Sequence, residues 1–334
     1  MTRVLVTGGA GFIGSHVAEA LLERGHEVTV LDDLSGGFAD NVPGRARFVK
    51  ASVTDHDAID RVCGDGRFDY VYHLAAYAAE GLSHFIKRFN YTNNVLGSVN
   101  LINASINSGV KGFVFASSIA VYGRSPVVPM TEETIPEPED PYGIAKYAVE
   151  RELAATRTIF GLDYVIFRPH NVYGPRQNIA DRYRNVVGIF MNQILQDRPM
   201  TIFGDGTQTR AFSYIDDVAP IMAAAIDEPR AWNGVFNVGA DEPWPLNDLA
   251  VRVAAAMGVA PRITHLPARH EVHNAHSSHE KIQRVFGRRE ATTLDEGLAA
   301  MAAWVKRHGP RSSPTFKGIE VTKNLPPSWR AGAE

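Results

Sequence analysis

The chain has little cysteine, little net charge and no long apolar run, and each shortage argues against a class of protein. Cys63 is the single cysteine in 334 residues, which excludes an internal disulfide framework and favours a reducing compartment. The net charge of −3 comes without a basic block, so a nucleic-acid partner is not expected. No apolar run reaches the length of a membrane span, and no leader precedes the strand predicted from Arg3. We therefore expect a cytoplasmic protein without a membrane or nucleic-acid partner.

A glycine-rich loop lies between a short apolar run and a helical pattern near the N-terminus. Val4–Val6 predicts a strand, and residues 16–24 predict a helix that stops at Gly25. The loop between them reads T-G-G-A-G-F-I-G, from Thr7 to Gly14. Glycines there allow a tight turn and a close approach of the backbone to a pyrophosphate at the helix N-terminus. The order of strand, loop and helix is typical of a dinucleotide-binding fold.

Two aspartates follow the second predicted strand, residues 27–31. Asp32 lies 18 residues after Gly14, where a carboxylate can accept hydrogen bonds from both ribose hydroxyls of NAD. The same charge repels a 2′-phosphate, and no arginine follows at once, so the sequence favours NAD over NADP. The alternative is a loop carboxylate with no ligand.

The remaining pattern alternates strands with helices, which predicts an α/β fold with a doubly wound parallel sheet. Strands are expected at 48–49, 70–73, 113–117 and 164–168, with a long helix over 84–108. We expect an NAD-binding Rossmann domain over 1–168 and a smaller, mainly substrate-binding domain over 169–309, with a segment near 213–240 returning to the sheet. Residues 310–334 are expected to form an extended or mobile tail.

Tyr142 and Lys146 lie on one face of a helix that Pro141 can begin. A tyrosine ordinarily titrates near 10, and a lysine cation nearby favours the phenolate, so the pair can provide a general base. The alternative is an exposed tyrosine and lysine with no joint role. Ser117 and Ser118 end a predicted strand, where ligands of open α/β sheets bind, although such serines also cap turns.

Seven motifs then occur in a fixed order. They are T-G-G-A-G-F-I-G at Thr7, the acid pair at Asp32, H-L-A-A at His73, S-S-x-x-V-Y-G at Ser117, Y-x-x-x-K at Tyr142, R-P-x-N-V-Y-G-P-R at Arg168 and G-D-G-x-Q-T-R at Gly204. Over about residues 3–300 this set resembles the extended short-chain dehydrogenase/reductases that act on nucleotide sugars, most of all the UDP-galactose 4-epimerases. The resemblance implies NAD as cofactor, a nucleotide sugar, with a UDP-sugar favoured, as substrate, and a homodimer formed by the helices at 84–108 and 142–159.

The resemblance also implies three sets of site residues. In the catalytic set Tyr142 is the base, Lys146 its modulator and Ser118 a hydrogen-bond partner of the sugar O4. The NAD set is Gly8, Gly11, Phe12, Ile13, Gly14, Asp32, Asp33, Val53, Leu74, Ala75, Ala76, Ser117, Tyr142 and Lys146. The substrate set is Glu80, Ser118, Tyr142, His170, Asn171, Thr201, Ile202, Phe203, Arg210, Arg269 and Glu271.

The sequence departs from the family pattern in three places. Ser52 stands where an aspartate usually touches adenine. The loop at Arg269 is one residue short, which bears on Glu271. His170 replaces an aromatic or apolar residue beside the substrate.

Other reactions of such proteins need groups that this sequence lacks. Ile119 and Ala120 occupy the places where 4,6-dehydratases carry Asp-Glu and decarboxylases a glutamate. Ala120 and Arg184 stand near the Cys and Lys of 3,5-epimerases, and arginine is a poor proton shuttle. A dehydratase, a 3,5-epimerase and a 4-keto reductase remain alternatives among enzymes, as does a non-catalytic NAD-sensing protein outside them.

Four histidines at every third position form a pattern that could suggest a metal site. They are His270, His273, His276 and His279. No thiolate accompanies them and the inferred chemistry needs no metal, so we expect none.

Overall fold

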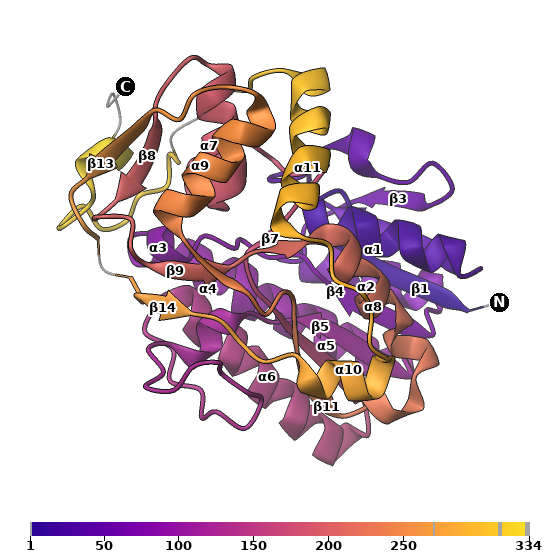
Figure 1. Ribbon diagram of the computed structural model, residues 1–334. Helices are drawn as coiled ribbons and strands as arrows, with labels where there is room; N and C mark the ends of the chain where they lie inside the picture. Colours follow the sequence, from indigo (N-terminus) through magenta and orange to yellow (C-terminus); the bar gives the residue numbers. More distant parts are fainter. Residues whose placement is uncertain (1, 270, 313–315, 331–334) are drawn as a thin grey trace.

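A computed structural model describes residues 2–269, 271–312 and 316–330, and its centre is a parallel sheet of seven strands (Figure 1). The strands lie in the order β11-β6-β5-β4-β1-β2-β3. Their bounds are β1 (Arg3–Thr7), β2 (Glu27–Asp32), β3 (Arg47–Lys50), β4 (Tyr70–His73), β5 (Gly112–Ala116), β6 (Asp163–Pro169) and β11 (Gly234–Val238). The predicted fold class, a doubly wound parallel sheet, is confirmed.

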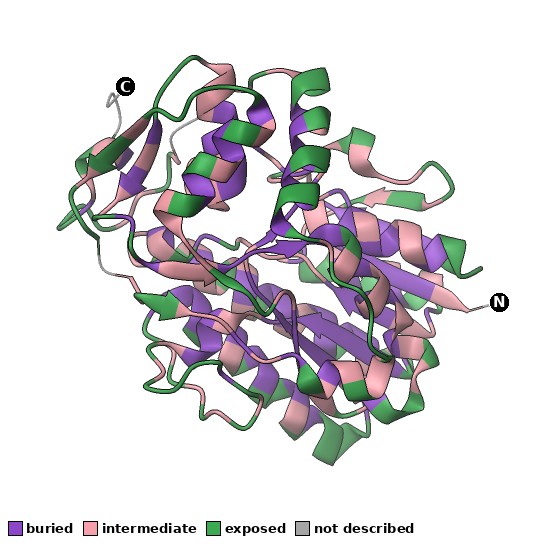
Figure 2. Cartoon of the chain, viewed as in Figure 1, coloured by how far each residue is buried: buried purple, intermediate pink, exposed green. Residues whose placement is uncertain are grey.

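Helices cover both faces of this sheet because alternate side chains of each central strand are apolar and buried. Val4 and Val6 belong to one apolar cluster, which includes α1 (Phe12–Glu23) and α8 (Ile215–Ala223). Leu5 points to the opposite face and joins a second cluster with α2 (His56–Gly66), α5 (Gly97–Asn107) and α6 (Pro141–Phe160). Figure 2 shows the central strands as the most continuously buried part of the chain.

The chain after β6 builds most of a smaller half that contains three small sheets and several helices. The sheets pair β7 (Val172–Tyr173) with β10 (Ser213–Tyr214), β9 (Thr209–Ala211) with β12 (Pro243–Pro245) and β14 (Asn274–Ala275), and β8 (Met200–Phe203) with β13 (Ile263–Leu266). The helices are α7 (Val186–Leu195), α9 (Leu246–Met257), α10 (Glu280–Phe286) and α11 (Leu294–His308). Within the segment 213–240, α8 packs on α1 and β11 pairs with β6.

The long helix predicted over 84–108 is interrupted in the structure. The short helices α3 (Glu80–Ser83) and α4 (Lys87–Tyr91) come first, and a π-helical turn over Thr92–Leu96 connects α4 to α5. The side chain of Asn94 explains the interruption, because it accepts from the backbone N–H of Tyr77 at 2.8 Å and donates to the Tyr77 carbonyl at 3.1 Å. Such π turns are frequent at functional sites, and this one fixes a loop that lines the cavity containing Tyr142.

An extended or mobile tail was predicted over 310–334; residues 316–330 have little regular secondary structure but are packed on the rest of the molecule, so for them the mobile alternative is wrong. Leu325 and Trp329 are 5% and 4% exposed, and this segment packs on both α4 and the smaller half of the molecule. We call residues 316–330 the C-terminal strap. Among the described residues, no helix is both long and apolar enough to cross a lipid bilayer.

Candidate active site

A cavity of about 500 Å³ opens at the carboxyl ends of the sheet strands, between the sheet and the smaller half. This is where ligands of open α/β sheets bind. It is lined by every residue of the predicted NAD set: Gly8, Gly11, Phe12, Ile13, Gly14, Asp32, Asp33, Val53, Leu74, Ala75, Ala76, Ser117, Tyr142 and Lys146. It is also lined by Glu80, Ser118, His170, Asn171, Arg210, Arg269 and Glu271 of the substrate set.

The glycine loop forms a cradle that side chains would fill. Gly8 has a φ of +72°, and a Cβ there would lie 2.6 Å from the backbone nitrogen of Ala75. A Cβ on Gly14 would lie 2.1 Å from the Gly8 carbonyl oxygen, so helix α1 could not approach the loop. The first turn of α1 presents unpaired backbone N–H groups, which suit a pyrophosphate. The loop therefore fits a dinucleotide, here NAD.

Asp32 holds this cradle against the second strand. Its two carboxylate oxygens accept from the backbone N–H of Ala10 at 3.0 Å and of Leu34 at 2.8 Å. Burial raises its pKa, and those two hydrogen bonds oppose the shift. A carboxylate has further lone pairs, so Asp32 can also accept from ribose hydroxyls where it borders the cavity.

Helix α6 begins where the sequence predicted, and its first turn aims Tyr142 into the cavity. The Asp140 carboxylate caps the helix by accepting from the N–H groups of Tyr142 and Gly143, both at 2.9 Å, and Pro141 occupies the first turn. Asn90 of α4 donates to the Pro141 carbonyl at 2.8 Å. Tyr142 is therefore fixed by contacts from two elements that lie far apart in sequence.

The electrostatics of this pair differ from the expectation that Lys146 lowers the tyrosine pKa. Burial raises the pKa of Tyr142, and its hydrogen bond with Ser118 opposes that shift. The Lys146 ammonium donates to the Ala116 carbonyl at 2.7 Å and lies 5.8 Å from the centre of the Tyr142 ring. Burial lowers the pKa of Lys146 to about 7. The expected lowering by Lys146 is not found among the chain's own residues: desolvation of the Tyr142 phenolate dominates, and the groups that oppose it are Ser118 and the Arg184 guanidinium.

A buried ion pair beneath the site was missed in the sequence. Arg168 donates to Glu150 of α6 from Nε at 2.9 Å and from Nη2 at 2.5 Å, and the Ser117 hydroxyl donates to the same carboxylate at 2.5 Å. Both charged side chains are about 5% exposed or less. The sequence showed the motif R-P-x-N-V-Y-G-P-R but not the partner of its first arginine. Arg168 connects β6 to α6, the helix that carries Tyr142.

Two arginines and two carboxylates gather at the far end of the cavity. Arg269 donates to Glu271 from Nε at 3.1 Å, and the Arg210 guanidinium donates to backbone carbonyls of Thr209, Val272 and His273. The positive charges of Arg210 and Arg269 act to lower the pKa of Glu80. Desolvation within the cleft, followed by the neighbouring Asp140 carboxylate, raises the pKa of Glu80, although its side chain remains accessible from the cavity. This end of the cavity therefore offers cations suited to a diphosphate.

Thr201, Ile202 and Phe203 are not among the described residues that line the cavity. They form β8, which pairs with β13, and Ile202 is fully buried. Phe203 lies one layer behind the wall, with its ring centre 4.6 Å from the Arg269 guanidinium carbon. The structure thus separates this strand from the rest of the predicted substrate set.

His170 faces the cavity but takes part in a network that leads away from it. Its Nε2 lies 3.1 Å from Nε2 of His279, whose Nδ1 lies 2.6 Å from the Asp241 carboxylate. The His170 Nδ1 lies 3.3 Å from the Ala211 carbonyl, which also accepts from Asn171. All these contacts are satisfied when His279 carries both ring protons and His170 only the one on Nδ1. Burial lowers the pKa of His170, which agrees with this neutral state.

The histidine series does not form a metal site in the described part of the chain. His270 lies outside the described residues, and no group of three or more His, Cys, Asp or Glu side chains elsewhere among them could hold an ion. His279 is engaged with Asp241, and His273 lies next to Thr207 and Asn274.

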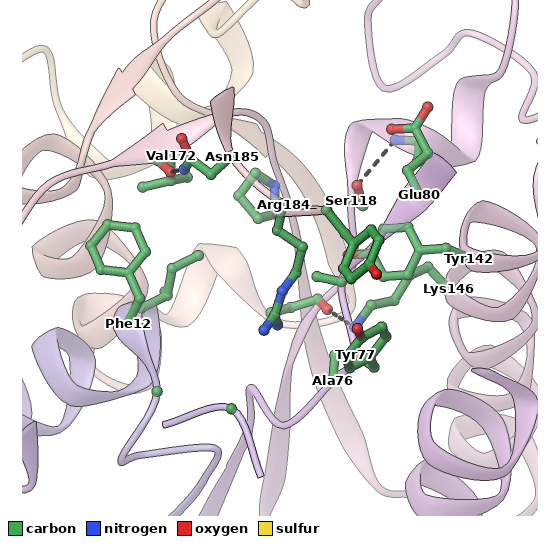
Figure 3. A pocket seen from close by; sticks show the side chains of 18 of the residues that line it. Phe12, Ala76, Tyr77, Glu80, Ser118, Tyr142, Lys146, Val172, Arg184 and Asn185 are labelled. Atoms are coloured by element: carbon green, nitrogen blue, oxygen red, sulfur yellow. Dashed lines mark hydrogen bonds between the residues drawn. The ribbon is translucent and has the colours of Figure 1, made fainter. Parts of the chain in front are cut away.

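Arg184 is a cavity residue whose position the sequence did not reveal. Figure 3 shows its side chain extending between Phe12 and Tyr142. It pairs with Asp181 at 2.5 Å, and its guanidinium carbon lies 5.0 Å from the centre of the Tyr77 ring. In the sequence Arg184 was noted only for standing near the lysine of 3,5-epimerases, and its contacts with Asp181 and Tyr77 become visible in the structure.

Comparison with known proteins agrees with this geometry. Residues 4–239 match the model of the NAD dependent epimerase/dehydratase family. The chain therefore belongs to this family, is an NAD-dependent enzyme, and confirms the resemblance found in its sequence.

Three similar proteins illustrate the relationship. A UDP-glucose 4-epimerase of Mycolicibacterium smegmatis is 35% identical over 304 residues, which are 89% of this chain and 96% of that protein. The crystal structure of a Thermotoga maritima UDP-glucose 4-epimerase with UDP-glucose is 35% identical, with a TM-score of 0.88 over 92% of this chain and 99% of that one. The Thermus thermophilus UDP-glucose 4-epimerase complex with NAD is 36% identical, with a TM-score of 0.85 over 91% and 98%.

The buried lysine makes stability depend on pH, and Lys146→Met tests it. The folded chain releases the Lys146 proton near pH 7, whereas an unfolded lysine keeps it up to about 10.5. Between these values unfolding takes up a proton, so raising the pH favours the folded state by up to ~1.4 kcal/mol per unit. We expect the free energy of unfolding of the wild type, measured in urea, to rise by ~2 kcal/mol more between about pH 7 and about pH 9 than that of Lys146→Met. Parallel stability curves for the two proteins would contradict the lowered pKa.

Proposed function

We propose that this chain is a UDP-sugar 4-epimerase that oxidises C4 of the sugar transiently and reduces it again on the other face. The observation that carries the proposal is the position of Tyr142. Its side chain borders the same cavity as the glycine cradle, together with Ser118 just past the carboxyl end of β5. The names of the similar proteins support the same activity.

The residues of the chain divide the work of this reaction among them. Tyr142 takes the proton from the sugar O4 as general base and returns it later as general acid. Ser118 holds O4 beside the phenol, while Arg210 and Arg269 hold the diphosphate as the sugar turns. When bound, NAD supplies the acceptor, and then the donor, for the hydride at C4. Because burial and the nearby Asp140 and Glu80 carboxylates raise the pKa of Tyr142, the base would depend on the positive charge of the oxidised nicotinamide ring, and on that of Lys146 where this amine is protonated.

Elimination of water and decarboxylation lack, among the described residues, the acid or base that they need directly after Ser118. The short helix Ile119–Tyr122 follows Ser118, and Ile119 and Ala120 border the cavity without a proton-transferring atom. A dehydratase or decarboxylase needs an acid or base there. A non-catalytic NAD-sensing protein does not need Tyr142 and Lys146, which this chain keeps together in the cavity.

A panel of nucleotide sugars tests the proposal. Pure protein is incubated with UDP-, GDP- and dTDP-hexoses, and the configuration at C4 is read by NMR. We expect UDP-glucose and UDP-galactose to interconvert with no net change in NAD, since each cycle returns the hydride. Loss of water from the sugar would indicate a dehydratase, and net oxidation of added NADH a 4-keto reductase. No change at C4 in any sugar would reject the epimerase.

The site assignments that the resemblance implied form part of this proposal. The NAD residues and the catalytic set keep their predicted roles. Thr201–Phe203 do not line the cavity, so we assign them an indirect role behind its wall and not direct contact with the nucleotide base. The domain limits near 168 and 309 are also kept as a proposal.

We also propose that the chain is a cytoplasmic homodimer, formed through the α4–α5 and α6 region. Apolar side chains are exposed there: Leu96 is 51% exposed, Ile144 42%, Ile159 72% and Phe160 63%. Exposed apolar side chains gathered on neighbouring helices mark interaction surfaces. The molar mass in light scattering, against 36.6 kDa for one chain, decides this point.

A further inference from the structure

The C-terminal strap connects both halves of the molecule beside the substrate end of the cavity. Figure 1 shows the strap, in yellow, next to β8 and β13 of the smaller half. The resemblance to the epimerases ends near residue 300, so it assigns the strap no role. Its contacts, however, are with residues that form the cavity wall.

The first part of the strap is fixed to the sheet half. The Glu320 carboxylate accepts from the backbone N–H groups of Arg88 and Phe89 at the start of α4, both at 2.9 Å. The N–H groups of Glu320 and Val321 donate to the Phe85 carbonyl at 2.8 and 3.2 Å. These bonds satisfy backbone groups at a helix start that would otherwise lack partners, so the strap is held in one register.

The second part of the strap inserts Trp329 between the two halves. The Trp329 ring centre lies 5.3 Å from that of Tyr183, 6.1 Å from that of Phe85 and 6.2 Å from that of Phe203. On the sheet side, a Cβ on Gly81 would lie 3.3 Å from the edge of the indole. Trp329 is therefore enclosed by elements from both halves, one layer behind Gly81 and Tyr183 of the cavity wall.

Trp329 also borders the arginine that faces the cavity at this end. The guanidinium carbon of Arg269 lies 5.8 Å from the Trp329 ring centre and 4.6 Å from that of Phe203. The Glu271 carboxylate accepts a hydrogen bond from Arg269 Nε at 3.1 Å and lies 3.0 Å from Arg269 Nη2 in an ion pair. Two aromatic rings and one carboxylate thus fix a long side chain that has many free rotamers in water.

We propose that the strap, through Trp329, positions Arg269 for the second phosphate of the nucleotide. This inference rests on the proposed function, because it assumes a nucleoside diphosphate at this end of the cavity. Trp329 is a positioning residue, since it acts through Arg269 and lies behind the wall. Its contribution is to nucleotide affinity, while proton and hydride transfer take place at Tyr142.

The test compares Trp329→Ala, Trp329→Phe and Val321→Ser in the full-length chain with its NAD. We expect Trp329→Ala to raise both the KM for UDP-glucose and the calorimetric Kd for UDP about tenfold, with kcat within about twofold. Binding of UMP, which lacks the second phosphate, is expected to weaken less than about threefold. Trp329→Phe keeps an aromatic ring beside Arg269 and is expected to recover most of the affinity. Val321 is 40% exposed, so Val321→Ser is the matched control within the strap and leaves all values unchanged.

The outcomes separate this inference from the proposed function. If the wild type neither binds UDP nor epimerises UDP-glucose, the proposed function fails. If the wild type does both and Trp329→Ala binds UDP equally well, the inference alone fails. Equal losses for UMP and UDP, or a parallel fall in kcat, would show that Trp329 only supports the fold and would also overturn it.

Discussion

Tyr142→Phe is expected to lower kcat for UDP-glucose epimerisation by about 10³-fold or more while UDP and NAD remain bound. General acid–base groups contribute about 10²–10⁴-fold, and here one phenol acts in both half-reactions. The ring stays in place, because Tyr142 is only 8% exposed and its backbone is capped by Asp140. Kinetics by coupled assay and NAD content by absorbance give the two measurements.

The control for this variant is stability, since a collapsed site would also lose activity. The Tyr142 side chain interacts with Ser118, so loss of the hydroxyl is expected to change the free energy of unfolding by no more than about 1 kcal/mol. An inactive variant whose stability changes by no more than this supports Tyr142 as the base. A kcat for Tyr142→Phe within tenfold of the wild-type value would show that Tyr142 is not the general base.

Glu150→Gln is expected to lower the free energy of unfolding by about 3–5 kcal/mol, because it leaves a buried guanidinium without its counter-charge. The side chain of Arg168 is 5% exposed and makes two of its hydrogen bonds to this carboxylate. Amide and carboxylate have nearly the same shape, so the loss is of charge and not of volume. Urea denaturation measures the change.

A surface ion pair is the matched control for this prediction. Arg252 and Asp295 lie 2.6 Å apart, but their side chains are 33% and 67% exposed. Asp295→Asn is expected to cost less than about 1 kcal/mol, since water screens the pair. The double variant Glu150→Met/Arg168→Met is expected to recover much of the lost stability, because it buries no charge. Similar costs for Glu150→Gln and Asp295→Asn would contradict the role of burial.

The parts of the site that the sequence predicted are those encoded by short segments. The cradle at Gly8–Gly14 and the pair of Tyr142 and Lys146 each depend on spacing within one strand–loop–helix unit or one helix. Neighbouring residues decide such features, so a motif contains nearly all the information. The order of motifs then gave the family and the sheet.

The parts that the sequence did not predict depend on contacts between distant segments. Asn94 interrupts a helix because it bonds the backbone of Tyr77, and no helical periodicity encodes that partner. Trp329 is buried against Gly81 and Phe85 near α3, Tyr183 in the loop before α7, and Phe203 of β8, which lie far from it in sequence. The pKa of Tyr142 was predicted in the wrong direction because spacing shows which charges are near, but not how much water is excluded.

Strand β11 carries a consequence for how the molecule can move. The chain leaves the sheet after β6, builds part of the smaller half, returns to pair β11 with β6, and leaves again. The exits after Pro169 and Val238 are therefore neighbours on one edge, and the strap adds a further crossing. A half that is connected to the sheet at several points cannot open by rotation about a single hinge. The room in which a keto sugar inverts must consequently be present in the resting architecture, without waiting for a large opening.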